Sequence, residues 1–197
     1  TSDDYTAYYQ VLASDRLAVA LEMEADRLAS LKLPADEFAR EIEVIKEERR
    51  LRTDDRPSAL AYERFKALAF PASGYRNPTI GWMSDLQRMQ VDDLRAWYQQ
   101  WYRPNNATLV IVGDVQRDQV EKLVTRFFAR IPGKPLPAAK PPLELATPGE
   151  RRTTLYLKTQ LPSLLMGFNV PGLATSEDAR SVHALRLLAA LLDGGSS

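Results

Sequence analysis

The sequence predicts an α+β fold in which a mixed or antiparallel sheet packs with helices, followed by the start of a second, similar α+β domain. Two observations support this prediction. Segments with the periodicity of amphipathic helices are interspersed with short apolar runs that are typical of strands. These strand-like runs stand both next to one another and separated by helices, which favours α+β over a doubly wound fold.

Residues 1–131 are expected to form most of the first domain. Residues 4–12 alternate and are rich in Tyr and Thr, which indicates a strand. Residues 107–113 are continuously apolar, as in a strand covered on both faces. Helices are predicted where apolar residues recur at spacings of three and four, over residues 14–32, 34–55, 57–68, 92–102 and 118–128. A short helix is expected to start at Ser84, with Gln87 completing a capping box.

Residues 132–150 are predicted to be a linker. Six of the thirteen prolines of the chain lie between residues 131 and 150, and this stretch has no periodic pattern. Residues 151–197 then contain two predicted strands, 154–159 and 163–170, and a predicted helix over residues 176–192. This order is the expected beginning of a second α+β domain, which the chain contains only in part.

Composition excludes several classes of function. The chain has 197 residues, with 26 basic and 26 acidic side chains, and this balance argues against nucleic acid as a partner. The helical spacing of Trp97, Tyr98, Trp101 and Tyr102 indicates core packing rather than a platform for stacking bases. No run approaches the roughly 18 apolar residues of a membrane span, so no membrane-spanning segment is expected.

Metal chemistry is limited by the absence of cysteine and by a single histidine, His183. A zinc hydrolase normally supplies two or three imidazoles, so this chain alone cannot build a histidine-based zinc site. Because His183 lies between apolar neighbours, it is expected to be a packed side chain rather than a ligand. The chain opens at TSDDYTAYY and closes on GGSS after an apolar helix, so it is expected to be a piece of a longer protein.

Two glutamates, Glu41 and Glu48, lie within the apolar stripe of the helix predicted over residues 36–52. At about 100° per residue, one broad face of this helix contains Phe38, Ile42, Val44, Ile45 and Leu51. The two glutamates are seven residues apart, so they project from that same face, two turns from each other. A buried carboxylate is strongly destabilising unless it is paired, protonated or bound to a cation. Each glutamate is therefore expected to have a partner.

Two kinds of partner are consistent with this pattern. In the first hypothesis an arginine neutralises each carboxylate, either Arg49 or Arg52 or one from a neighbouring helix. In the second, one carboxylate binds a metal and the other supports it, since two turns of one helix give the rigid spacing that metal ligands need. The residues alone leave both hypotheses open, although structural ion pairs are the more common case.

Several motifs occur together in one order along the chain. The segment EIEVIKEE fits the pattern E-x-x-V-I-x-x-E at Glu41, Val44, Ile45 and Glu48. TSDDYTAYY precedes it, and PTIGWMSDLQRM, DDLRAWYQQWYRPNNATLVIVGDV, GFNVPG and LLDGGSS follow it. With this ordered set, which covers nearly the whole chain, the sequence resembles the pitrilysin/insulinase family of zinc peptidases. It is most similar to exported bacterial members, and the family also includes the mitochondrial processing peptidases.

The resemblance implies an activity and a division of roles. Members are inverzincins, in which an H-x-x-E-H helix supplies two histidine ligands and the glutamate that activates a zinc-bound water. Glu48 aligns with the downstream glutamate that is the third zinc ligand, and Glu41 aligns with an acidic residue that assists catalysis without binding zinc. The resemblance further implies a peptide or unfolded polypeptide as substrate, a periplasmic or exported location, and a possible homo- or heterodimer with a related subunit.

The sequence also departs from the family pattern, because no H-x-x-E-H occurs in it. The motif is expected just before Thr1, so the chain is expected to be an inactive fragment of a zinc metalloendopeptidase. The alternative is a non-catalytic partner subunit, or a paralogous half, that binds peptide and shapes the chamber. Retention of both Glu41 and Glu48 favours the catalytic hypothesis, since an apolar face would not otherwise keep two carboxylates.

Overall fold

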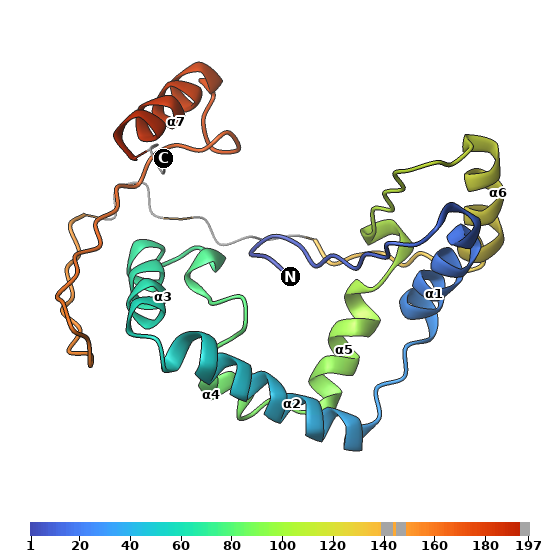
Figure 1. Cartoon of the computed structure of the whole chain (residues 1–197), viewed down its shortest axis with the longest axis horizontal. Coiled ribbons are helices and arrows are strands. Elements are labelled where there is room, and N and C mark those ends of the chain that lie inside the picture. Colours follow the sequence, from blue (N-terminus) through green and yellow to red (C-terminus); the bar gives the residue numbers. More distant parts are fainter. Residues whose placement is uncertain (139–143, 145–148, 194–197) are drawn as a thin grey trace. The chain divides into compact units, whose positions relative to one another are not determined.

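The computed structural model describes residues 1–138, 144 and 149–193 (Figure 1). The chain divides into two compact units, Thr1–Lys158 and Thr159–Ser197. The predicted domains 1–131 and 151–197 and the linker between them stay predictions. Residues 139–143 and 145–148 of that linker lie outside the described part of the chain.

The predicted α+β class is wrong, because the described residues contain helices and no β-strand. In chain order the longer helices are α1 (Leu17–Ser30), α2 (Ala35–Arg49), α3 (Pro57–Ala69), α5 (Val91–Trp101), α6 (Arg117–Phe128) and α7 (Ala179–Asp193). The shorter ones are η1 (Ser14–Arg16), the π-helix η2 (Arg50–Asp54), η3 (Gly74–Arg76), α4 (Met83–Leu86) and η4 (Pro104–Asn106). The helices therefore lie close to where their periodicity predicts them, and the error concerns the strands.

The strand prediction failed because a strand needs a hydrogen-bonded neighbour as well as an extended backbone. At the start of the apolar run 107–113, Ala107 has φ −118° and ψ 144°, which are β-region angles. No ladder forms along this run within the described residues, and Val110 and Val112 are 75% and 91% exposed. The apolar content of this run thus indicated an extended segment correctly. It could not indicate whether another segment lies beside it to form a ladder.

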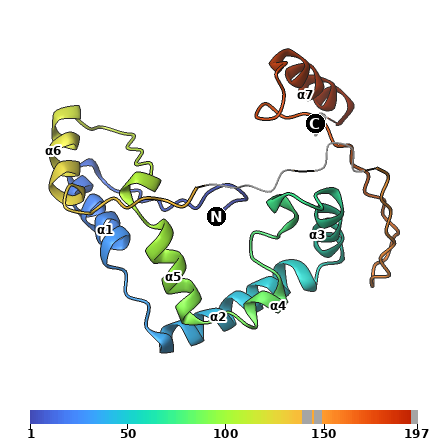
Figure 2. The same ribbon diagram turned by 180° about the vertical axis from the view of Figure 1, so that it is seen from behind.

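Helices α1 and α6 lie side by side in both views of the first unit (Figures 1 and 2). Tyrosines connect α1 to α5, and the end of α5 to the N-terminal segment. Tyr98 donates a hydrogen bond to the carbonyl of Arg27 at 2.9 Å, and the hydroxyls of Tyr8 and Tyr102 are 2.5 Å apart. Burial and the contact with Tyr8 raise the pKa of Tyr102 above its usual range. Trp97 of α5 is largely exposed, so the predicted burial of the whole aromatic cluster is wrong for this residue.

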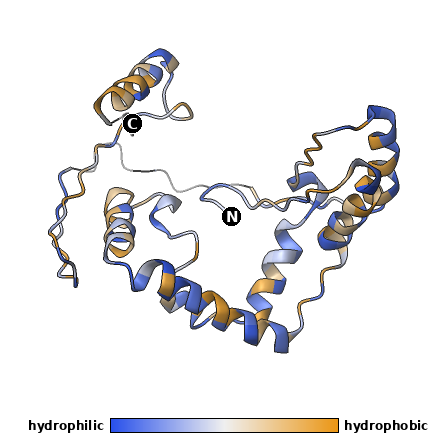
Figure 3. Ribbon diagram, viewed as in Figure 1, coloured by the Kyte–Doolittle hydropathy of each residue, from blue (hydrophilic) through white to orange (hydrophobic). Residues whose placement is uncertain are grey.

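Helix α2 carries both hydrophobic and hydrophilic residues along its length (Figure 3). It starts after Pro34, which has β-region angles, and its last turn runs directly into η2, which ends at Asp54. Helices α3 and α4 pack near this end of α2–η2. The expected capping box at Ser84 does not form; instead Gln90 and Asp93 cap each other's backbone at the start of α5.

Core substitutions should separate buried from exposed leucines. Leu86 of α4 is 4% exposed and Leu51 of η2 is 57% exposed. We expect Leu86→Ala to lower the free energy of unfolding by about 2–5 kcal/mol, because it leaves a cavity. The matched change Leu51→Ala should cost less than about 1 kcal/mol. Urea unfolding followed by circular dichroism measures both losses. Equal losses would show that Leu86 is not buried in solution.

Candidate functional site

The two glutamates of the E-x-x-V-I-x-x-E motif lie on α2 but in different surroundings. Glu41 is exposed, while the side chain of Glu48 keeps 40% of its accessible surface. The prediction that both lie within a buried apolar stripe is therefore wrong. Neither carboxylate is desolvated enough to require a partner on that ground alone.

The buried face of α2 is narrower than the predicted stripe, to which Ile42 already belonged. Its buried residues are Ile42 and Arg49, which are also seven residues apart, whereas Val44 is mostly exposed. Each glutamate directly precedes one of these buried residues and so projects about 100° away from the buried face. The prediction was too broad because it treated every apolar residue of this face as buried. It also missed Arg49, which is one of the two buried side chains.

Glu48 pairs with an arginine from the π-helix that follows it. The Oε1 atom of Glu48 lies 2.8 Å from Nη1 of Arg52. Arg52 is itself largely exposed, so this ion pair lies in solvent and is worth about 0–1 kcal/mol. The contact agrees with the first hypothesis for Glu48, in which an arginine neutralises the carboxylate. Being weak, it also leaves that carboxylate available to a stronger ligand.

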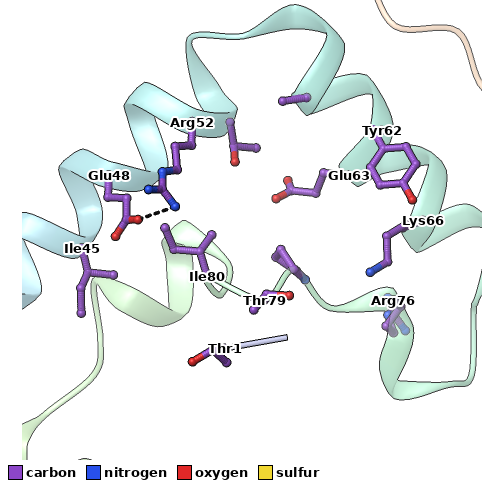
Figure 4. Close-up of a pocket in the computed structure, with 13 residues that line it drawn as sticks. Thr1, Ile45, Glu48, Arg52, Tyr62, Glu63, Lys66, Arg76, Thr79 and Ile80 are labelled. Atoms are coloured by element: carbon purple, nitrogen blue, oxygen red, sulfur yellow. Dashed lines mark ion pairs between the residues drawn. The ribbon is translucent and has the colours of Figure 1, made fainter. Parts of the chain in front are cut away.

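Glu48 and Arg52 form part of the wall of an open hollow of about 730 Å³ (Figure 4). The walls come from α2–η2, from α3, and from the loop that runs through residues 78–80. The lining residues with polar side chains include Glu48, Arg52, Tyr62, Glu63, Lys66 and Thr79. Glu41 is not among the lining residues. The structure thus brings one of the two predicted site residues to the hollow.

A buried ion pair joins the two helices that flank the hollow. Arg49 of α2 and Glu63 of α3 are 3% and 6% exposed. Their contact is bidentate, with Nη1 donating to Oε2 at 2.8 Å and Nη2 donating to Oε1 at 3.0 Å. The Glu63 carboxylate raises the pKa of Arg49 above its ordinary value by accepting these hydrogen bonds. This geometry is the strong form of an arginine–carboxylate pair.

Two further groups contact the same guanidinium. The carbonyl of Gly81 accepts a hydrogen bond from Nη1 of Arg49 at 2.7 Å, and Asp54 lies 3.3 Å from Nη2. The Nε atom of Arg49 is buried and has no hydrogen-bond partner within the described residues. One arginine therefore touches α3, the end of η2 and the loop before α4.

This cluster was not predicted from the sequence. Arg49 was considered only as a counter-ion for the glutamates of the motif, and Glu63 was not singled out. Arg49 lies seven residues after Ile42, so the two project from the same face of the helix. This spacing is the feature of the sequence that could have indicated a buried Arg49. Nothing in the sequence indicates that Glu63 meets it, because that contact depends on how α3 packs against the end of α2.

The N-terminal segment closes one side of the hollow. Lys66 of α3 donates hydrogen bonds to Asp3 at 2.9 and 3.1 Å, and Thr79 donates to the same carboxylate at 3.1 Å. These contacts, led by Lys66, lower the pKa of Asp3 below its ordinary value. Thr1 consequently lies among the residues that line the hollow (Figure 4).

The described residues do not by themselves form a metal centre. No group of three or more His, Cys, Asp or Glu side chains comes together in that part of the chain. His183 is exposed on α7, in the second unit, so the expectation that it is a packed side chain is wrong. In the hollow, Glu63 is occupied by Arg49, which leaves Glu48 as the accessible carboxylate among its lining residues. The residues present could thus contribute one ligand, and they do not fit a complete zinc site.

Comparison with known proteins assigns the chain to a class and then to a family. Over 203 aligned residues it is 32% identical to "Zinc protease PqqE" of Helicobacter pylori, covering 100% of this chain and 44% of that relative. The family described as "Peptidase M16 inactive domain" matches residues 88–197. The chain therefore belongs to the pitrilysin/insulinase family of peptidases, as its motifs predicted. It spans less than half the length of this curated relative.

Solved structures are similar to about two thirds of the chain. A protease from Helicobacter pylori superposes with a TM-score of 0.63 at 33% identity, covering 68% of this chain and 32% of that one. The first half of the periplasmic protease PqqL from Escherichia coli gives a TM-score of 0.60 at 20% identity, covering 68% and 29% of the two chains. The second likeness shows the fold alone. None of the helices in the described part of the chain is long and apolar enough to cross a membrane.

Removing the acidic member of the buried pair should be strongly destabilising. Glu63→Gln leaves Arg49 buried without its main counter-charge, and we expect a loss of about 3–5 kcal/mol in the free energy of unfolding. Arg117 and Glu121 form an exposed pair on α6, so Arg117→Ala should cost less than about 1 kcal/mol. Chemical denaturation at neutral pH compares the two, and a small loss for Glu63→Gln would show that the pair is not buried in solution.

Proposed function

We propose that this chain is part of a zinc metalloendopeptidase that hydrolyses peptide bonds, and that Glu48 is the third zinc ligand of its active site. The family assignment and the similarity to a zinc protease support the class of enzyme. The observation that carries the residue assignment is the position of Glu48. It aligns with the family's ligand position, projects from a regular helix, and lies at an accessible hollow, where among the described residues it forms a weak ion pair with the solvent-exposed Arg52.

The remaining ligands would come from outside these 197 residues, since the chain has one histidine and no cysteine. Zinc bound at such a site would act as a Lewis acid on a peptide carbonyl and lower the pKa of a bound water. The role of this chain is then to supply a carboxylate that is fixed in direction by α2. The chain on its own is proposed to be inactive.

Glu41 is proposed to assist this site without binding zinc. It lies two turns before Glu48 on α2, about 10 Å along the helix axis. Its exposure and its absence from the lining of the hollow are consistent with a secondary role rather than ligation. The assignment is supported by its alignment with the acidic residue that accompanies the family's ligand.

Peptides or unfolded polypeptides are the proposed substrates, and export to the bacterial periplasm is the proposed location. The first follows from the peptidase family, and the second is supported by the similarity to exported bacterial members of it. A homo- or heterodimer with a related subunit is the proposed form of assembly. Gel filtration of the full-length protein with multi-angle light scattering tests the last point.

One observation favours a second function. The family description that matches residues 88–197 is that of an inactive domain. A non-catalytic subunit, or a paralogous half that binds peptide and shapes a chamber, would also carry this domain. Such a protein would bind peptide without cleaving it and would have no use for the carboxylate of Glu48. The two functions therefore differ in whether zinc and Glu48 are needed.

Substitution of Glu48 tests the proposed enzyme. In the full-length protein that contains this chain, we expect Glu48→Gln to lower zinc affinity and peptide cleavage by at least about 100-fold, because an amide oxygen is a much weaker zinc ligand than a carboxylate. Glu41→Gln should lower cleavage by roughly 10- to 100-fold while zinc remains bound. Zinc content by atomic absorption and cleavage of a fluorogenic peptide measure the two effects.

Glu43→Gln is the matched control, because Glu43 lies on the same helix and pairs with Lys46 rather than with a group of the hollow. It should leave zinc content and cleavage unchanged. The chain alone should hold no stoichiometric zinc after dialysis. Full zinc occupancy in Glu48→Gln would refute the ligand assignment, and peptide binding without cleavage in the wild type would favour the non-catalytic subunit.

Arg52 should compete weakly with the metal for Glu48. Because an exposed ion pair is worth about 0–1 kcal/mol, we expect Arg52→Gln to tighten zinc binding by no more than about fivefold. The gain should shrink as the salt concentration rises, since screening already weakens the pair. Competition with a chromophoric chelator at low and high salt measures it. A loss of affinity in Arg52→Gln would mean that Arg52 supports the site instead of competing for it.

A further inference from the structure

The guanidinium of Arg49 contacts three elements near the hollow: α3, η2 and the loop before α4. Its own helix is α2, which carries Glu48 as the preceding residue. Its contacts reach Glu63 on α3, Asp54 at the end of η2, and the carbonyl of Gly81 in the loop before α4. Glu63 itself lines the hollow that Glu48 faces. A single side chain, that of the residue after Glu48, thus touches three elements of this region.

The chemistry of arginine suits this task. The guanidinium is planar and rigid, so its donors hold several acceptors in fixed directions at once. Lysine has the same charge but concentrates it on one flexible ammonium group. Because Arg49 is buried, water cannot easily replace the contacts that it makes. Loss of any one contact therefore changes the arrangement of the elements rather than exchanging a protein partner for solvent.

The π-helix makes the end of α2 a place where such control is needed. In η2 the amide of Asp55 donates to the carbonyl of Arg50 at 2.9 Å, five residues back. π-Helical turns are rare and often occur at functional sites, since they rotate the side chains that follow them. Arg52, the counter-ion of Glu48, lies inside this turn. The contact of Arg49 with Asp54 holds the last residue of the turn.

Gly81 supplies the fixed acceptor on the loop. Its φ of +89° lies in the region that favours glycine, and a Cβ there would lie 3.5 Å from Leu86. This backbone conformation accompanies the carbonyl that accepts from Arg49. A side chain at this position would therefore disturb the acceptor without changing any charge.

We propose that Arg49 is a positioning residue for the zinc ligand: its contacts with Glu63, Asp54 and Gly81 set the direction of Glu48 and the width of the hollow. The proposal rests on the proposed function of Glu48. A purely structural role for the same ion pair would affect the fraction of folded protein and leave zinc affinity per folded molecule unchanged. The two roles are therefore separable by experiment.

The experiment uses the full-length protein that contains this chain and a variant that keeps stability while losing the contacts. Replacing both members of a buried ion pair by apolar residues of similar size is often neutral for stability. The double variant Arg49→Met/Glu63→Leu removes both charges of the pair together, so it should unfold closer to the wild-type urea midpoint than Glu63→Gln does, while it loses the contacts to Asp54 and Gly81. Arg49→Lys keeps the charge but removes the planar fork of donors. Gly81→Ala keeps Arg49 but strains the backbone that carries the acceptor carbonyl.

Ile42→Val is the matched control. Ile42 is buried on the same face of α2, seven residues before Arg49, and its truncation weakens packing without touching the cluster. Zinc affinity is measured by chelator competition and corrected for the folded fraction, beside KM and kcat for a peptide. Hydrogen exchange at the amides of Asp55 and Arg56, which close the turn, gives a readout that needs no metal.

We expect the double variant, Arg49→Lys and Gly81→Ala to bind zinc about 10- to 100-fold more weakly than the wild type, as happens when residues that support a metal ligand are removed. Their kcat should fall more than their KM rises, and exchange at Asp55 should quicken. Ile42→Val should match the wild type in all three. If the double variant and Arg49→Lys bind zinc like the wild type while Glu48→Gln does not, Arg49 is structural only and the positioning role is overturned.

Two other outcomes are equally decisive. If Glu48→Gln itself leaves zinc affinity unchanged, the proposed function of Glu48 fails before the role of Arg49 is tested, and faster exchange at Asp55 would then report on η2 alone. If Ile42→Val weakens zinc as much as Arg49→Lys does, the effect follows stability, and the positioning role is again overturned.

Discussion

The bidentate contact between Arg49 and Glu63 is the interaction on which the arrangement of this region depends. Two buried, oppositely charged side chains join α2 to α3, and the same guanidinium also holds the end of η2 and the loop before α4. A pair this buried is not simply stabilising, because both ions lose their hydration. It constrains the structure instead, because either charge would be buried without a counter-charge in any arrangement that separated the two.

Around this fixed point, the accessible charges behave differently. Glu48 and Arg52 meet in solvent, where their attraction is weak and depends on salt. The zinc ligand role proposed for Glu48 requires a carboxylate that is held in direction but not neutralised. The buried pair provides rigidity, and the exposed pair leaves the carboxylate available.

Helices were predictable because their signal is local: apolar spacing, Pro34 before α2 and Pro57 within the first turn of α3 locate them closely. The strands were not, because pairing is a property of two segments and not of one. Residues 107–113 have the composition of a strand but no ladder within the described part of the chain. Of the carboxylates that line the hollow, the motif indicated Glu48 but not Glu63, and Glu41, which it also indicated, does not line it.

By itself, the sequence determined the family, through motifs in a fixed order, and the helical register that places Glu41 and Glu48 two turns apart. Only the tertiary structure decided which face of α2 is buried, and this face carries Ile42 and Arg49. The physical reason is that helical periodicity fixes relative angles along one helix but no absolute direction. That direction depends on the partner, and here the partner is a carboxylate on α3, 14 residues away in sequence and 2.8 Å away in space.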